Sequence, residues 1–76
     1  MVTAYVLVTA KSGMEREIFA QLEDIKQVKK VYEIFGEWDL IAEVVVKELP
    51  ELDVIISEKI RVIPEVEMTS TLIAVE

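Results

Sequence analysis

Two short segments of the chain place polar groups close together along the sequence. The first is Gly36-Glu37-Trp38-Asp39, and the second is Thr69-Ser70-Thr71. Their carboxylates and hydroxyls can hydrogen-bond a small polar ligand, but neither segment contains Arg or Lys. An anionic group of such a ligand would therefore depend on backbone N–H donors or on a neighbouring subunit.

The side-chain inventory argues against catalysis. The chain has no Cys, which removes disulfides, thiolate metal sites and thiol nucleophiles, and no His, which removes the commonest general base and zinc ligand. Tyr5, Tyr32 and Asp39 remain as candidates for enzyme chemistry, and they form no pair at a suggestive spacing. We therefore expect no catalytic residue, no metal site and no cofactor.

Composition restricts the class of partner. The 76 residues make one small domain with a net charge of −7, and such a domain repels phosphate, so we expect no direct nucleic-acid binding. No apolar run approaches the roughly 20 residues of a membrane span, and no signal peptide is visible, so we expect a cytoplasmic protein. The Ile-, Val-, Glu- and Lys-rich composition is also typical of thermophiles.

Hydrophobic periodicity predicts the element order βαββαβ. Ser12 and Glu15 match a capping box at the start of the first helix, and Gly36 marks a hairpin between the second and third strands. Pro50 suits the first turn of the second helix, and Pro64 ends it. The predicted strands cover residues 2–10, 28–37, 38–47 and 66–75, and the predicted helices cover residues 13–24 and 50–61.

Two interleaved right-handed βαβ units predict an α+β, ferredoxin-like fold. Its four-stranded antiparallel sheet has the strand order 4-1-3-2, with both helices on one face. Strands one and three are the most apolar and take the central positions. Strands two and four carry the charges expected of edge strands, such as Lys29, Lys30 and Glu67.

The strands are apolar on both faces, although two helices can cover only one. The uncovered face would present a large apolar patch to water, and such patches mark interfaces. Burying each side chain of the patch contributes roughly 1.5–3 kcal/mol, so a symmetric sheet-to-sheet dimer, like a dimeric α/β barrel, is the expected solution. The predicted dimer interface consists of Tyr5, Leu7, Ile41, Val45, Ile73 and Val75.

These features together resemble a known family. The Gly-x-aromatic-Asp turn, the "LDVIISEKI" helix, the "IPEV" link and the final "TST" are similar to the RAM domain, the C-terminal effector-binding domain of Lrp/AsnC (feast/famine) transcription regulators. The resemblance spans essentially all 76 residues, with Trp38 where a Tyr is usual and Glu65 where a Gly is usual. The helix-turn-helix DNA-binding domain of the full regulators has no counterpart here, so we expect a stand-alone RAM domain over residues 1–76.

The resemblance implies dimers that associate into octameric or similar rings and bind a small amino acid in clefts near the turn. Asp39 would accept hydrogen bonds from the ammonium, and backbone N–H groups at Gly36 and Glu37 would hold the carboxylate. Trp38 would either contact the side chain of the ligand or pack against a neighbouring subunit. Strand alternation puts the hydroxyls of Thr69 and Thr71 on one side and that of Ser70 on the other.

Three functions remain open from the sequence. The first is an amino-acid sensor whose ligand changes oligomeric assembly, or co-assembly with full-length Lrp/AsnC regulators, and so modulates transcription indirectly. The second is a small dimeric ferredoxin-like enzyme of the monooxygenase or isomerase type. The third is a structural assembly subunit without a ligand. A ligand site would lie either within a dimer or between dimers.

Overall fold

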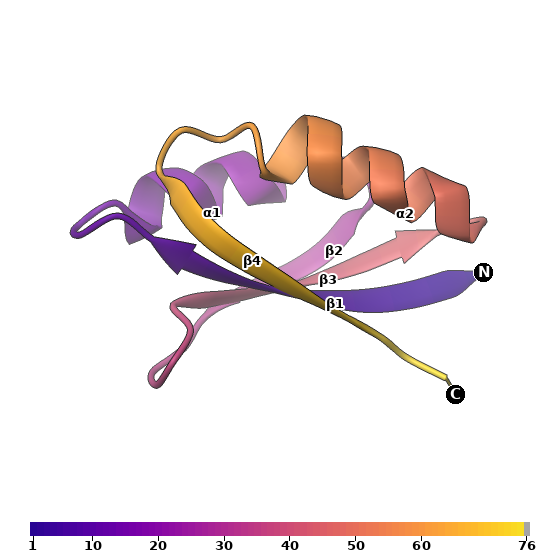
Figure 1. Ribbon diagram of the computed structural model, residues 1–76, viewed down its shortest axis with the longest axis horizontal. Coiled ribbons are helices and arrows are strands. Elements are labelled where there is room, and N and C mark those ends of the chain that lie inside the picture. The colour runs from indigo at the N-terminus through magenta and orange to yellow at the C-terminus, as the bar shows by residue number, and fades with distance from the viewer. Residues whose placement is uncertain (76) are drawn as a thin grey trace.

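The computed structural model describes residues 1–75 and contains one antiparallel sheet. The strands pair in the order β2-β3-β1-β4, which is the predicted 4-1-3-2 order read from the other edge. Both helices lie on the same face of the sheet (Figure 1). The predicted fold class is therefore confirmed. The strands are β1 (Val2–Ala10), β2 (Val28–Glu33), β3 (Leu40–Val46) and β4 (Val66–Ile73).

The first helix, α1 (Glu15–Glu23), starts two residues later than predicted. The chain turns first at Gly13, whose φ is +79°, and the N–H of Met14 donates to the carbonyl of Lys11 at 2.9 Å. Met14 is the N-cap residue and makes no side-chain capping bond, so the predicted capping box at Ser12 is wrong. Because the chain turns at Gly13, the helix begins beyond the reach of a cap at Ser12.

The second helix changes its geometry part-way. It runs as α2 (Leu49–Ile55) and continues as a π-helical turn, η1 (Ile56–Ile60), in which the N–H of Arg61 donates to the carbonyl of Ile56 at 2.8 Å. Ile55 and Ile60 are both buried although they lie five residues apart, a spacing that would put them about 140° apart on a regular α-helix. The π turn, with its i→i+5 bonding, brings both side chains to the core.

The link between β2 and β3 is a loop of residues 34–39 and not the tight hairpin predicted. Strand pairing stops at Glu33 and Leu40, and the N–H of Ile34 donates to the carbonyl of Asp39 at 2.9 Å across the loop base. Gly36 has a φ of +133°, a conformation that side chains disfavour. In Figure 1 this loop projects beyond the sheet, away from the helices.

The core lies between the sheet and the helices. Register places alternate residues of β1 and β3 directly opposite one another on the helix-facing side, and all of these are buried except Val2, which is half-buried. Ile18 and Leu22 of α1 are fully buried against them. The opposed pairs at the centre of the core are Ala4–Val44, Val6–Ala42 and Val8–Leu40.

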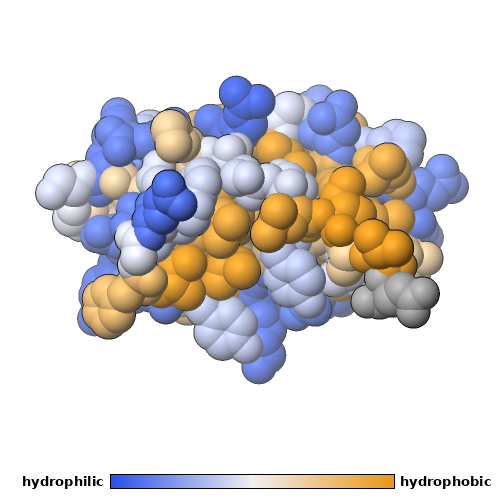
Figure 2. Space-filling model, turned by 60° about the horizontal axis from the view of Figure 1, so that its bottom comes forward, coloured by the Kyte–Doolittle hydropathy of each residue, from blue (hydrophilic) through white to orange (hydrophobic). Residues whose placement is uncertain are grey.

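The other side of the sheet, here called the open face, carries no helix. Tyr5, Leu7, Ile41 and Val45 lie there half-buried, as the sequence predicts. Figure 2 shows apolar side chains gathered in a band across the molecule when the underside of the sheet is turned forward. The uncovered apolar surface that the strands imply is therefore present.

On the last strand, the prediction places Ile73 on the wrong side of the sheet. Ile73 pairs with Ala4 and so lies on the helix-facing side, whereas Leu72 pairs with Tyr5 on the open face. Leu72 is 55% exposed, and Met68, which points to the same face of the strand, is 59% exposed. Val75 follows the end of β4, is almost fully exposed and borders Tyr5 and Glu43 of the open face, so its place in a dimer interface stays a prediction. This strand carries apolar residues on both faces. Only its pairing register with β1 therefore decides which face points toward the helices.

Candidate functional site

The turn segment sits in the β2–β3 loop. Gly36 and Glu37 are exposed, while Trp38 and Asp39 are half-buried. No atom lies within 4 Å of the position that a Cβ on Gly36 would occupy, so space around this residue is open. The backbone at Gly36 is accessible to a ligand or to another subunit.

Asp39 ties this loop to the end of β1. Its Oδ2 accepts a hydrogen bond from the N–H of Ala10 at 2.8 Å, and its own N–H donates to the carbonyl of Val8 at 2.9 Å. The carboxylate therefore has a structural function that the sequence did not reveal. A carboxylate offers about four acceptor positions, so this bond leaves capacity for a ligand ammonium.

A cavity of about 360 Å³ adjoins Asp39. Glu15 and Glu33 also line it, so its electrostatics favour a cationic group. Phe35, a further lining residue, is fully exposed, and sequence reasoning missed it although it stands directly before the loop glycine. Among residues 1–75, no cluster of three or more acidic side chains is arranged to hold a metal ion.

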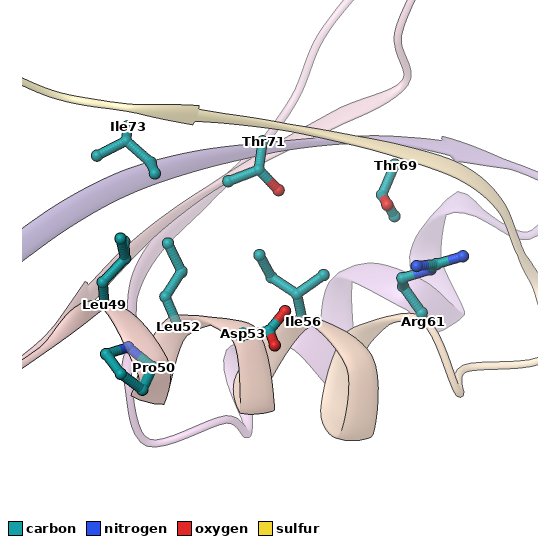
Figure 3. A pocket seen from close by; sticks show the side chains of 9 residues that line it. All are labelled: Leu49, Pro50, Leu52, Asp53, Ile56, Arg61, Thr69, Thr71 and Ile73. Carbon is teal, nitrogen blue, oxygen red and sulfur yellow. The ribbon is translucent and has the colours of Figure 1, made fainter.

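The threonine segment lies elsewhere. Register with β1 puts Thr69 and Thr71 on the helix-facing side and Ser70 on the open face, the division that strand alternation predicts. Thr69 and Thr71 line a larger groove, of about 700 Å³, between β4 and the helix formed by α2 and η1 (Figure 3). Arg61 lines the same groove.

The two predicted segments are separated by β1. Asp39 bonds to Val8 on one side of this strand, and Thr69 pairs with Val8 on the other. With adjacent strands about 4.8 Å apart, the two backbones are roughly 10 Å apart. In the part of the chain that the structure describes, the two segments line different cavities.

The Lrp/AsnC ligand binding domain matches residues 3–76 of the chain. The chain belongs to this family. The predicted resemblance is thus confirmed, and it extends over nearly the whole sequence.

Individual relatives agree with this assignment. The HTH-type transcriptional regulator FL11 from Pyrococcus abyssi is 30% identical over 73 residues, which are 96% of this chain and 48% of that regulator. The crystal structure of FFRP-DM1 is 47% identical, with a TM-score of 0.95, and the match covers 99% of this chain and all of that one. A transcriptional regulator from Neisseria meningitidis in complex with L-Met shares the fold, with a TM-score of 0.89 at 14% identity over 99% of this chain and 50% of that one.

The Lrp/AsnC domain thus spans about half the length of the curated regulator that it matches. Its relatives are ligand-binding domains and transcriptional regulators, which agrees with the expectation of a non-enzymatic domain. Within the described residues, every helix is too short or too polar to span a lipid bilayer.

Proposed function

We propose that this Lrp/AsnC domain is a cytoplasmic, non-enzymatic amino-acid-binding module. It forms dimers through the open face, and a bound amino acid shifts its further assembly, including co-assembly with full-length regulators. The observation that carries the proposal is the separation of the turn and the threonine segment within one chain. A single small ligand can touch both segments only if they come from two subunits.

The open face supplies the driving force for the first contact. Leu7 and Ile41 pair in register at its centre, and Leu72 adds a side chain that is more than half exposed. At roughly 1.5–3 kcal/mol for each large apolar side chain, burial of these groups from two subunits exceeds the roughly 3–5 kcal/mol that a core of this size supplies alone. A two-fold sheet-to-sheet packing covers both copies at once.

One charged residue limits how the sheets can pack. Glu43 lies on the open face, opposite Tyr5 on β1 and opposite Lys30 on β2. The ammonium of Lys30 lies 5.9 Å from the centre of the Tyr32 ring, so the residue opposite Glu43 carries a cation close to the ring. Because a buried unpaired charge is costly, the dimer must keep Glu43 near Lys30 or near water.

Sedimentation of an Ile41→Glu variant tests the dimer. We expect wild type to sediment as an assembled species at micromolar concentration and Ile41→Glu to sediment as an 8.7 kDa monomer. Val54→Glu is the control, since Val54 is exposed on α2, on the opposite side of the sheet. An 8.7 kDa wild-type monomer would refute the dimer.

The β2–β3 loop is the proposed second contact between subunits. Phe35 leaves a large apolar side chain wholly in water beside the accessible backbone of Gly36, as expected of a surface that another subunit covers. We expect Phe35→Ser to retain the dimer and to lose species larger than the dimer. If Phe35→Ser loses the dimer itself, Phe35 belongs to the dimer interface and not to a second contact.

Titration calorimetry with the twenty amino acids tests ligand binding. The backbone N–H groups around Gly36, the Asp39 carboxylate and the threonine hydroxyls offer donors and acceptors for a zwitterion. We expect heat from at least one amino acid and a change in assembly when it binds, which requires unequal affinity for the two assembly states. No heat from any amino acid, on protein shown to be assembled, would refute the sensor.

A further inference from the structure

Basic side chains gather at the end of the sheet that lies opposite the β2–β3 loop. The chain has eight Lys and Arg residues and a net charge of −7. Three of the eight, Lys26, Lys29 and Lys47, are exposed and line one cavity of about 330 Å³, here called the lysine hollow. A hollow lined by charges of one sign attracts ions of the opposite sign. This corner of the molecule can therefore attract an anion that the rest of the chain repels.

The lysine hollow is remote from both segments of the candidate site. β3 runs from Leu40, at the β2–β3 loop, to Val46, which lines the hollow (Figure 1). At about 3.3 Å per residue, the two ends of this strand are about 20 Å apart. The threonine segment lies on β4, at the opposite edge of the sheet from β2, which carries Lys29. A ligand of the lysine hollow would therefore be distinct from the amino acid of the proposed function.

Three hydrogen bonds join the segments that carry the lysines. The N–H of Val45 donates to the carbonyl of Gln27 at 2.9 Å and so ties the end of β3 to the link before β2. Glu51 Oε1 accepts a hydrogen bond from the N–H of Lys47 at 3.0 Å, and its Oε2 accepts one from the Gln27 amide at 3.3 Å. These segments are thus held together before any ligand binds, which lowers the cost of ordering them around a ligand.

The type of basic residue indicates which anion fits. The described lining residues include three lysines and no arginine. A guanidinium matches a flat carboxylate through its fixed fork of N–H donors, whereas lysine ammoniums are compact point charges that can surround a tetrahedral group. Glu51 is the one carboxylate among the described lining residues, so three ammoniums and one carboxylate leave two net positive charges. A phosphoryl group with two or more negative charges complements this hollow.

We propose that the lysine hollow binds the phosphoryl group of a small, water-soluble phosphate compound. The ammoniums of Lys26, Lys29 and Lys47 contact its oxygens, and Glu51 holds the backbone beneath them. The volume of about 330 Å³ lies at the lower end of the roughly 300–1,000 Å³ typical of small-molecule sites, so the ligand is compact. An extended polyanion would also meet the acidic remainder of the chain, which disfavours it.

Titration calorimetry with inorganic diphosphate on the assembled wild-type protein tests the proposal. We expect wild type to bind diphosphate and K47Q to bind it about fivefold more weakly, the upper range for an exposed ion pair. Replacing Lys26, Lys29 and Lys47 together by Gln should abolish detectable binding. Thermal melting checks that the variants remain folded, as expected for exposed side chains.

K59Q is the matched control for K47Q. Lys59 is exposed on η1 and does not line the hollow, and its replacement changes the net charge by the same amount. We expect K59Q to bind diphosphate as wild type does. Equal losses in K47Q and K59Q would overturn the proposal, because they would show a response to net charge alone. No heat from diphosphate with wild type would overturn it as well.

E51Q should change the affinity in the opposite direction. The amide oxygen of the new side chain can still accept the hydrogen bond from the N–H of Lys47, but the negative charge beside the anion is gone. We expect E51Q to bind diphosphate about twofold to fivefold more tightly. E58Q, which alters an exposed glutamate on η1, should match wild type. A weaker affinity in E51Q at an unchanged Tm would contradict the proposed position of the anion.

Two further probes identify the kind of anion and its source. Succinate, a dicarboxylate, should bind wild type about tenfold more weakly than diphosphate, because it lacks the tetrahedral group. Vesicles of phosphatidylcholine and phosphatidylglycerol present phosphate at a lipid surface, and we expect no co-sedimentation with them, since the net charge of −7 opposes contact with an anionic surface. Equal affinity for succinate, or vesicle binding that K47Q abolishes, would overturn the assignment to a small phosphate compound.

Discussion

Replacement of Asp39 separates the structural and ligand-binding functions of this residue. In Asp39→Ala, the half-buried N–H of Ala10 loses the acceptor that lies 2.8 Å away, and the loop loses its tie to β1. An unsatisfied buried donor costs about 1–3 kcal/mol, and we expect about 2 kcal/mol here. In Asp39→Asn, the amide oxygen still accepts the bond without the charge, so the expected loss is about 1 kcal/mol.

Urea denaturation at a fixed protomer concentration measures both losses. For a domain of this size, each 1 kcal/mol corresponds to a fall of about 4–8 °C in Tm, so thermal melts provide a second measurement. Asp39→Asn should then show, in calorimetry, whether the carboxylate also binds ammonium, because its fold is nearly intact. An unfolding free energy for Asp39→Ala within about 0.5 kcal/mol of wild type would refute the structural argument, since surface changes without such a role have effects of that size.

Three further substitutions test the fold. Leu22→Ala should cost about 2–5 kcal/mol in urea denaturation, because Leu22 is fully buried; a loss below 1 kcal/mol would show that α1 packs differently. Ser12→Ala should change stability by less than about 0.5 kcal/mol, since Ser12 caps nothing in α1; a loss near 1 kcal/mol would restore the capping box. Gly36→Ala should cost about 1–3 kcal/mol through its positive φ alone, as open space surrounds the site, and an unchanged Tm would argue against the loop conformation.

The fold was predictable because local and long-range signals agreed. The apolar spacing of Ile18 and Leu22 required a helix, and the charges on the outer strands assigned the edges. The capping box prediction is wrong because the chain turns at Gly13, so that α1 begins only at Glu15 with Met14, and not Ser12, at the N-cap. The sequence predicts the wrong side for Ile73 because β4 carries apolar residues on both faces. Which face points to the helices depends on the pairing register with β1, a strand more than sixty residues away.

The candidate site was predictable only in part. The family resemblance pointed to the Gly36–Asp39 turn and to Thr69–Thr71. It did not reveal the hydrogen bond from the N–H of Ala10 that already uses one oxygen of the Asp39 carboxylate. Arg61 was missed because it lies outside both segments and reaches Thr69 only through the packing of the helix on β4. The five-residue interval between Ile55 and Ile60 was the available signal, because it contradicts a regular α-helix.

The π turn also has a consequence for how this sequence tolerates insertion and deletion. A π turn accommodates one more residue than the α turn that it replaces, so the helix carries a single removable position. Deleting one residue such as Ser57 would let the helix close as regular α-helix. Ile60 would then stand four residues after Ile55, a spacing at which a regular α-helix also brings both side chains to the core. This helix should therefore tolerate the loss of one residue at a point where a regular α-helix would turn its buried side chains away from the core.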